Sequence, residues 1–401
     1  MNNLPSRKNI WIIWFMTFFN GLIFYAPIFA LYLQQELLDF TQVALIMAFQ
    51  SGFIILFEIP SGAFADIFGR KKSLVIGGCL QLISLLFLFF GNNFIILTCF
   101  ALTSALFQSL NSGTIEAVVY DALKEENVSQ ASLNNIQKKI TFKQFIAING
   151  AIWPISASIA SLLGGFLSIY GYKLTILITF IPTFIKLLFT FKIKEPTYIK
   201  PEKKKMVAQI KTSLKYIHLD KQLKLLLLSG FLVYSFAEVA FQIKPIYLNA
   251  IKLPIELFGI IYTLSFALSF LGSLLSEKIS HNFSYKSLLI SSQISIGILF
   301  FVPSFIPLAL VNAMIMTIES FFWGLRWPIQ IDWINSRVNS NERATINSAT
   351  NLMNQLGFTI FIIFSGMSLE IITPIWLIRF MGIFQIITFF LLLGLHKRKN
   401  N

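Results

Sequence analysis

Two acidic residues lie deep within long apolar stretches of this chain and are its first candidates for chemistry. Glu238 is near the middle of residues 223–248, and Glu319 is near the middle of residues 307–333. An ionisable group inside an apolar stretch of membrane-spanning length is costly, so it usually faces a cavity or a partner. A carboxyl group there can take up and release a proton, which makes both residues candidates for proton or cation coupling.

The residues that follow these acids lie on the same helical faces. Gln242 is four residues after Glu238, a spacing that places both side chains on one face of a helix. Glu319 is followed at i+4, i+7 and i+8 by Trp323, Arg326 and Trp327. The alternative to coupling is a structural ion pair between helices, for example Glu319 with Arg326. Lys244 is six residues from Glu238, which is a poor spacing for a shared face.

Other polar residues in the apolar stretches have weaker claims. Glu116 is near the end of its stretch, where a structural or gating role is as good an interpretation as contact with a substrate. Asn20 and Tyr25 can offer polar contacts to a substrate, although residues five apart share a helical face imperfectly. Lys186 and Arg379 can extend toward a polar boundary or form a pair, and we assign them no role.

The sequence has no pattern that is typical of catalysis. Its three histidines, His218, His281 and His396, lie outside the apolar stretches. It contains no phosphate-binding loop, no metal-ligand spacing and no nucleophile constellation. We therefore expect neither enzyme activity nor a cofactor or metal. Without a nucleotide site, an ion gradient, most simply one of protons, is the expected source of energy.

The composition places these residues in a membrane protein. Of 401 residues, 56% are hydrophobic and 12% are charged, whereas a soluble domain carries about 25% charged residues. Mean hydropathy is +0.72, so the bilayer is the expected solvent. Windows of about 20 residues predict twelve membrane-spanning helices at residues 10–32, 42–63, 73–91, 94–119, 144–167, 173–191, 223–248, 256–276, 287–304, 307–333, 345–367 and 372–395.

The basic residues predict how these spans are oriented. The net charge is +14, and with both termini cytoplasmic only Lys173 and Lys252 fall in the expected outer loops. Nearly all the other Lys and Arg residues then lie on the cytoplasmic side, apart from four within spans. This asymmetry is the positive-inside pattern. It explains the basic charge without nucleic-acid binding.

A polar segment divides the chain into two halves of six spans. Residues 192–224 are rich in Lys, and an apolar face recurs at helical spacing at Met206, Ile210, Leu214 and Ile217. This predicts an amphipathic helix on the inner leaflet that tethers the halves, with a regulatory role as the alternative. The predicted domains are an N-terminal bundle (1–191), a basic linker (192–222) and a C-terminal bundle (223–401).

The halves show traces of a repeat. Gly113 and Asp121 in the fourth span are eight residues apart, as are Gly324 and Asp332 in the tenth span, at an offset of 211. The same offset carries Asp66 to another acid, Glu277. Together with six spans in each half, this favours parallel repeats related by an axis along the membrane normal.

A short charged loop between the second and third spans suggests a family. It reads Gly62-x-x-x-Asp66-x-x-Gly69-Arg70-Lys71, which resembles motif A of the major facilitator superfamily in spacing, loop and topology. Ile67 stands where the family usually has a basic residue. The resemblance implies an all-α fold of twelve transmembrane helices in two six-helix bundles with pseudo-two-fold symmetry. It also implies that the first, fourth, seventh and tenth helices line a central cavity.

The residues of this loop suit a conformational gate. Gly62 allows helix backbones to approach closely, and Gly69 permits the positive φ of a tight turn. Asp66 can face a helix N-terminus or pair with Arg70, while the basic residues hold the loop inside. The resemblance implies a latch between the halves that favours the outward-facing state and includes Glu58. The alternative is a turn that only fixes topology.

These observations together favour a secondary transporter in a bacterial inner membrane, working by alternating access as a monomer among membrane lipids. We expect proton-coupled export of an amphipathic small molecule. Residues 112–121 loosely resemble a fourth-span signature of bacterial exporters in this superfamily. A proton-coupled importer of a nutrient is one alternative. A non-transporting sensor or scaffold on the same fold is another, although the chain has no long soluble appendage beyond its linker.

Overall fold

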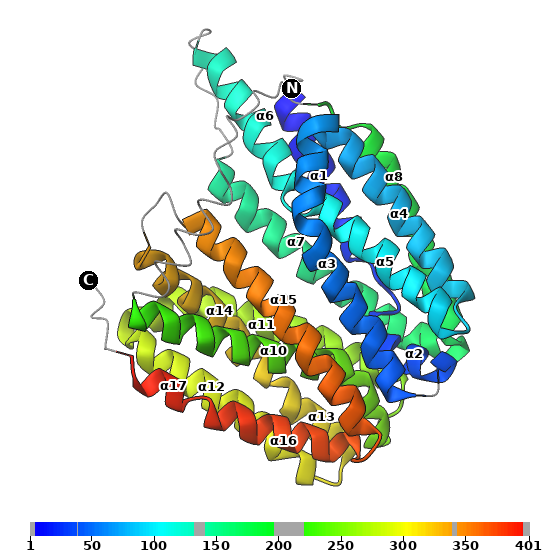
Figure 1. Cartoon of the computed structure of the whole chain (residues 1–401), viewed down its shortest axis with the longest axis vertical. Helices are drawn as coiled ribbons and strands as arrows, with labels where there is room; N and C mark the ends of the chain where they lie inside the picture. Colours follow the sequence, from blue (N-terminus) through cyan, green and yellow to red (C-terminus); the bar gives the residue numbers. More distant parts are fainter. Residues whose placement is uncertain (1–4, 38, 132–140, 196–219, 339–342, 396–401) are drawn as a thin grey trace. The chain divides into compact units, whose positions relative to one another are not determined.

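The computed structural model describes residues 5–37, 39–131, 141–195, 220–338 and 343–395 (Figure 1). Within these ranges the regular structure is entirely helical. The predicted amphipathic face at Met206, Ile210, Leu214 and Ile217 lies outside the described residues.

The chain packs into two compact units. Unit 1 comprises residues Met1–Ala26 and Phe49–Glu202, and unit 2 comprises Pro27–Ala48 and Lys203–Asn401. Residues 27–48, which the sequence analysis placed in the N-terminal bundle, therefore pack with unit 2. A Cβ built at Gly366 would lie 2.7 Å from the carbonyl oxygen of Phe40, and the N–H of Thr41 donates to Glu370 Oε1 at 3.0 Å.

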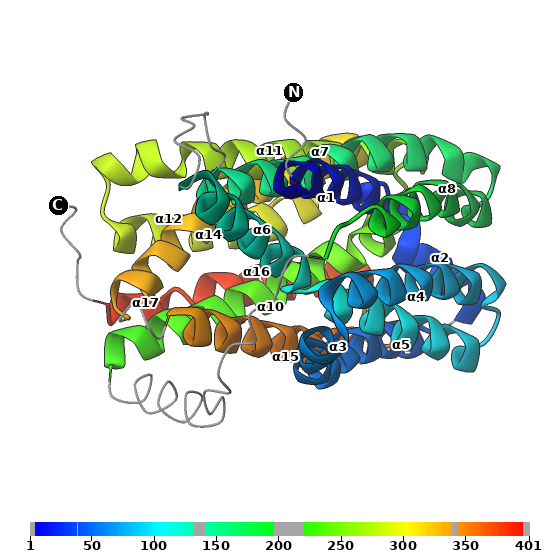
Figure 2. The ribbon, with the colours of Figure 1, turned by 90° about the horizontal axis from the view of Figure 1, so that it is seen from above.

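Unit 1 is built from six predicted spans. Its helices are α1 (Pro5–Gly21), the second part of α3 (Phe40–Phe68), α4 (Arg70–Phe90), α5 (Phe94–Asn111), α6 (Thr114–Ala131), α7 (Phe142–Leu167), the short η2 (Ser168–Tyr170) and α8 (Tyr172–Phe191). Helix α4 packs against both α5 and α8, while α1 packs against α7 and α8 (Figure 2).

Unit 2 holds the remaining helices. They are η1 (Ala26–Ile28), most of which belongs here, α2 (Phe29–Leu37), the first part of α3, α10 (Lys221–Ala250), α11 (Glu256–Asn282), α12 (Tyr285–Phe301), η3 (Pro303–Phe305), α13 (Ala309–Thr317), α14 (Glu319–Ser336), α15 (Arg343–Leu369), α16 (Pro374–Ile387) and α17 (Phe390–Leu393). Helix α14 packs against α11 and α12, and α10 packs against α15 and α16.

Most of the predicted spans are confirmed, and three of them are interrupted. The first, at residues 10–32, is divided between α1 and α2, with η1 between them. Eleven segments in the described ranges are long and apolar enough to cross a membrane. The predicted tenth span instead forms α13 and α14, which meet at Ile318. The fourth span is divided into α5 and α6 at Gly113, whose φ of 68° is one that only glycine adopts readily.

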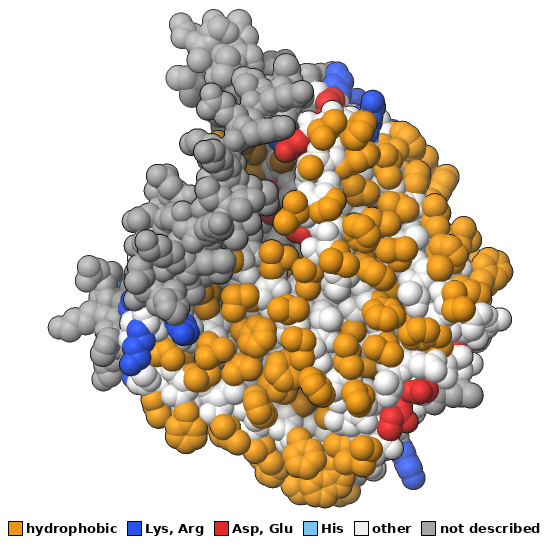
Figure 3. Space-filling model, viewed as in Figure 1, with side chains coloured by type: hydrophobic (Ala, Val, Ile, Leu, Met, Phe, Trp, Pro, Cys, Tyr) orange, Lys and Arg blue, Asp and Glu red, His pale blue; other side chains and the backbone are white. Residues whose placement is uncertain are grey.

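The surface of the described residues is that of a membrane protein. Hydrophobic side chains cover most of the described surface in Figure 3. Leu56, Ile95 and Ile371 are 66%, 75% and 87% exposed. A soluble monomer rarely exposes so much contiguous apolar surface. The chain is therefore a multi-pass membrane protein, as its composition predicts.

The closest helix packing in unit 2 depends on two glycines. A Cβ built at Gly324 of α14 would overlap the backbone carbonyl of Ser269 on α11, and one at Gly272 of α11 would overlap that of Phe321 on α14. The absence of side chains at these positions lets the two backbones touch, as small residues do between membrane helices.

We predict that Gly324→Ala destabilises unit 2 because the methyl group pushes α14 away from α11. The expected loss is about 1–3 kcal/mol, the usual cost of overpacking, read as a lower thermal unfolding midpoint in detergent. Gly150→Ala is the matched control, since a Cβ at Gly150 meets no atom of the described residues within 4 Å. Equal midpoints for the two variants would contradict the close approach of α11 and α14.

Candidate functional site

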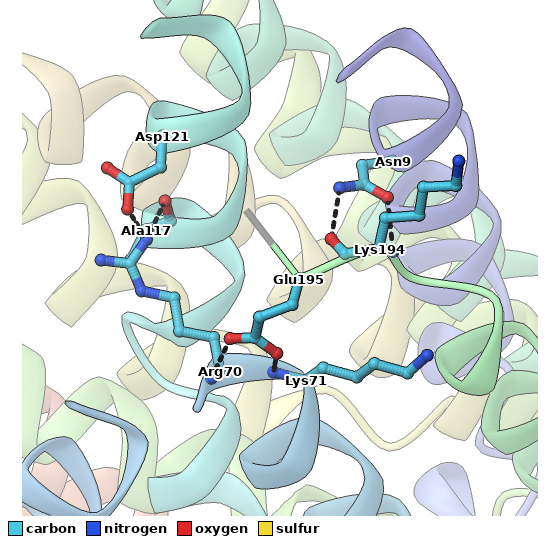
Figure 4. A network of polar contacts seen from close by, with 7 residues as sticks. All are labelled: Asn9, Arg70, Lys71, Ala117, Asp121, Lys194 and Glu195. Carbon is cyan, nitrogen blue, oxygen red and sulfur yellow. Dashed lines mark hydrogen bonds and ion pairs between the residues drawn. The ribbon is translucent and has the colours of Figure 1, made fainter. Parts of the chain in front are cut away.

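The charged loop of the sequence analysis ends at the first turn of α4, and that turn binds a carboxylate. The N–H of Arg70 donates to Glu195 Oε1 at 2.6 Å, and the N–H of Lys71 donates to Glu195 Oε2 at 2.8 Å (Figure 4). The free N–H groups and the helix dipole both favour a negative charge at this position. Glu195 follows α8, so it ties the end of the sixth span to the start of the third.

Gly69 makes room for this carboxylate. Its φ is 103°, which confirms the prediction of a positive-φ turn. A Cβ at this position would lie 3.3 Å from Glu195 Oε1. A larger residue here would therefore meet both backbone strain and the capping group.

The side chain of Arg70 points to a different helix. It forms an ion pair with Asp121 of α6 and donates to the carbonyl oxygen of Ala117 at 2.6 Å (Figure 4). Both partners of the ion pair are largely buried, with 11% and 20% of their side chains exposed. The loop is thereby fixed to α6.

A third contact fixes the segment after α8 that carries Glu195. Asn9 of α1 donates to the carbonyl oxygen of Lys194 at 2.9 Å and accepts from its N–H at 3.0 Å (Figure 4). The network therefore connects α1, α4, α6 and the segment after α8 within unit 1. Glu195, Asp121 and Asn9 were not candidates in the sequence analysis.

The remaining predicted gate residues lie on α3 and α6. Asp66 is exposed in the last turn of α3, and Glu58 accepts from the hydroxyl of Ser112 at 3.1 Å. Glu116 is exposed on α6. The expectation that Gly62 allows a close helix contact is wrong for unit 1, because a Cβ there would meet nothing within 4 Å among the described atoms.

In unit 2, Glu238 has a neutral partner. Gln242 Nε2 donates to Glu238 Oε1 at 2.9 Å, as their spacing on α10 predicts. No cation of the described chain forms an ion pair with this carboxylate. One turn earlier on α10 lies Tyr234, which packs against two tryptophans of α14, Trp323 and Trp327, at ring-centroid distances of 5.9 Å and 6.1 Å.

Glu319 has a different partner from the one suggested by sequence spacing. Its carboxylate is 3.5 Å from Lys244 Nζ, and the pair is buried, with 9% and 2% of the side chains exposed. Ser320 donates to the same carboxylate, and Lys244 also donates to Ser265. The alternative interpretation of Glu319 as part of a structural ion pair between helices therefore has support, with Lys244 of α10 as the partner in place of the example Arg326.

Arg326 is buried without an acidic partner among the described residues. It is 2% exposed and donates to the carbonyl oxygen of Leu289 at 2.9 Å and to the hydroxyl of Ser229 at 3.0 Å. The guanidinium group therefore connects α14 to α12 and α10. Its position is interior to unit 2, so it holds the helices together.

Asn20 belongs to a polar cluster inside unit 1. Its side-chain oxygen accepts from Lys186 Nζ at 3.1 Å, and Gln81 Oε1 accepts from the same amine. The amine is 4.0 Å from the ring centroid of Phe107. Sequence spacing did not reveal this cluster, because its members come from α1, α4, α5 and α8.

The comparisons with known proteins agree with this architecture. The family model of the Major Facilitator Superfamily matches residues 13–362. The chain belongs to the major facilitator superfamily. This family consists of transporters rather than enzymes, as the lack of catalytic patterns predicts.

One relative and several solved structures are similar to the chain. An uncharacterised MFS-type transporter, YxaM of Bacillus subtilis (strain 168), is 26% identical over 244 residues, which are 60% of this chain and 58% of that protein. The nucleoside transporter NupG has a TM-score of 0.77 at 13% identity, covering 98% of this chain and 99% of its own. A D-xylose-proton symporter has a TM-score of 0.73 at 11% identity, with 97% of each chain covered. At these identities the solved structures show the shared fold alone.

We predict that Asp121→Asn weakens the network around α4 because Arg70 loses its charged partner. A hydrogen bond to a charged group contributes about 1.5–3 kcal/mol, so the thermal unfolding midpoint in detergent should fall measurably. Glu116→Gln removes an exposed charge from the same helix and serves as the control. A midpoint for Asp121→Asn no lower than that of the control would contradict a stabilising role for the ion pair.

Proposed function

We propose that this chain is a secondary transporter that exports an amphipathic small molecule in exchange for protons, with Glu238 as the coupling acid. The observation that carries the proposal is the Glu238 carboxylate, which has a neutral amide as its hydrogen-bond partner and follows, by one helical turn, a tyrosine packed against tryptophan. Glu238 is on α10, the seventh span, which the family resemblance expects to line the central cavity.

The other charges inside the spans of unit 2 are already engaged. Lys244 is paired with Glu319, and Arg326 is held by a carbonyl and a hydroxyl. Arg379 donates to Ser304 and lies 3.9 Å from the ring centroid of Phe305. These contacts leave Glu238 as the carboxylate that a proton or a cationic substrate can neutralise. Because an unneutralised charge inside a span is costly, binding of either the proton or the substrate is favourable.

The rings packed at the turn of α10 before Glu238 favour an amphipathic substrate. Tyr234, Trp323 and Trp327 are only partly buried, and Trp323 and Trp327 are 6.0 Å apart between ring centroids. Such rings offer a flat apolar surface with a few polar atoms at their edges. A few placed polar groups on an aromatic lining are typical of small-molecule sites.

We further propose that the motif loop acts as the conformational gate. Its members are Gly62, Asp66, Gly69, Arg70, Lys71 and Glu58. The support is that the loop bonds to three other elements of unit 1 through Glu195, Asp121 and Ser112. Hydrogen bonds and ion pairs of this kind can stabilise one of the two conformations, inward-facing or outward-facing, between which an alternating-access transporter moves.

The direct test uses purified protein in proteoliposomes with an imposed pH gradient. Ethidium is a suitable amphipathic probe, and a panel of sugars and nucleosides represents the nutrient alternative. Ethidium movement against its own gradient, driven by protons moving the opposite way, is the expected result. Uphill movement of a nutrient in the same direction as protons would establish import instead. No pH-driven movement of any probe would contradict proton coupling.

We predict that Glu238→Gln abolishes uphill transport but retains counterflow exchange, because the amide keeps the size and hydrogen bonding of the acid without its proton. Glu319→Gln is the matched comparison. It removes the partner of the buried Lys244 and should cost about 3–5 kcal/mol of stability, so it should lower folding yield and every transport mode together. Wild-type uphill transport by Glu238→Gln would exclude this acid as the coupling site.

We also propose that both termini lie on the cytoplasmic side of a bacterial inner membrane, and the two ends of α4 offer a simple test. Lys72 and Asn92 are exposed at its opposite ends. We predict that a single Cys at Asn92 reacts with an impermeant thiol reagent added to intact cells, whereas one at Lys72 reacts only after permeabilisation. The background for both is a chain in which Cys79 and Cys99 are replaced. The reverse labelling pattern would invert the proposed orientation.

A further inference from the structure

We propose that Lys186 of α8 exchanges a proton during the transport cycle and is a second proton-carrying group, in unit 1, besides Glu238 in unit 2. The inference rests on the proton coupling proposed above. It starts from a buried amine that neither the motif loop nor the Glu238 site uses.

The surroundings of Lys186 are polar but uncharged. Its side chain is buried, with the residue 3% exposed, and its amine contacts the side-chain oxygens of Asn20 and Gln81 and the ring of Phe107. No carboxylate of the described chain forms an ion pair with it. Lys244, which is also buried, does have a carboxylate, at 3.5 Å. The two lysines therefore stand in opposite electrostatic settings.

The contacts of Lys186 fit the amine in both of its protonation states. A neutral amine has two N–H donors, and two amide oxygens are present to accept them. An ammonium group has a third donor, and the face of Phe107, at 4.0 Å, can receive that positive charge. A proton can thus be gained or lost at Lys186 Nζ without leaving a new unpaired donor in the interior.

The corresponding helices of unit 2 contact a cation of a different kind. There, Gln293 of α12 donates to Thr388, near the end of the last span, and accepts from Ser229 of α10 at 3.4 Å. These are the third, sixth and first spans of that half, as Gln81, Lys186 and Asn20 are in unit 1. The Ser229 hydroxyl also accepts from the guanidinium of Arg326 at 3.0 Å, and a guanidinium does not release its proton in proteins. The amine in unit 1 differs from it in its ability to titrate.

The other ionisable groups on the helices around Lys186 do not contact it. Those that the structure describes are Lys8 on α1, Arg70, Lys71, Lys72 and Cys79 on α4, Cys99 on α5, and Tyr172 and Lys173 on α8. Among the described residues, the amine contacts only the two amides and the ring. Any proton exchanged at this cluster is therefore exchanged at Lys186.

The first experiment needs no substrate. Thermal unfolding midpoints are measured in detergent for the wild type, Lys186→Arg and Lys186→Gln between about pH 5 and pH 9. Arginine keeps the charge but cannot release its proton, and glutamine has no proton to release. If folded Lys186 exchanges a proton in this range, the ratio of wild-type to variant unfolding constants changes with pH by up to about tenfold per pH unit. Parallel profiles for the wild type and both variants would overturn the proposal.

Lys244→Arg is the matched control for the substitution itself. It places arginine at another buried lysine, where Glu319 keeps the site charged. Its profile should run parallel to that of the wild type. A profile for Lys244→Arg that diverges as much as that of Lys186→Arg would show that arginine at any buried lysine alters the pH dependence, and would remove the support for Lys186.

The second experiment connects the exchange to transport. With ethidium as the probe, Lys186→Arg should lose pH-driven uphill movement and keep counterflow at the wild-type rate. Retained uphill movement would reduce Lys186 to a packing residue. If the wild type itself shows no pH-driven transport, the proposed function fails, while the stability profiles still decide whether Lys186 exchanges a proton.

Discussion

A charge inside a bilayer has to be satisfied by the protein itself, and this constraint accounts for most of the polar contacts in the chain. Water is not available there to solvate an unpaired group. The buried cations show three solutions. Lys244 has a carboxylate at 3.5 Å, Arg326 has a backbone carbonyl and a hydroxyl, and Lys186 has two amides and an aromatic face. Each solution connects different helices, so the charges also determine which helices are held together.

The same constraint explains where helices are interrupted. An interruption exposes backbone groups that need partners. At the start of α4 the Glu195 carboxylate accepts two such N–H groups. After α5, the hydroxyl of Ser112 reaches Glu58 where the chain turns at Gly113. At Ile318 the break lies beside the buried pair of Glu319 and Lys244. Ionisable side chains and broken helices therefore occur together, which is the arrangement expected of elements that change conformation.

The local features of this fold could be predicted from sequence, because each depends on a pattern within one helix. The spans follow from apolar runs, the positive φ of Gly69 from its place in a turn, and the bond between Gln242 and Glu238 from a spacing of four. Partners from different helices could not be predicted. Lys244 was set aside because it is on the wrong face for Glu238, yet it meets Glu319, which is far away in sequence. Glu195 looked like one acid in a basic linker, and only the packing of α8 beside α4 brings it to a helix N-terminus.

The comparison of the two units indicates which polar residues go beyond packing. In both, the residue at the start of the third helix of the half bonds to an aspartate on the fourth. Arg70 pairs with Asp121 in unit 1, and the hydroxyl of Tyr285 donates to Asp332 at 2.7 Å in unit 2. The contact with the aspartate is present in both units, although a hydroxyl in unit 2 takes the place of the guanidinium in unit 1. The connection between the two helices is therefore the shared structural feature. At the polar cluster of the first, third and sixth spans, unit 1 uses the amine of Lys186, which can release its proton, whereas unit 2 uses the guanidinium of Arg326, which cannot.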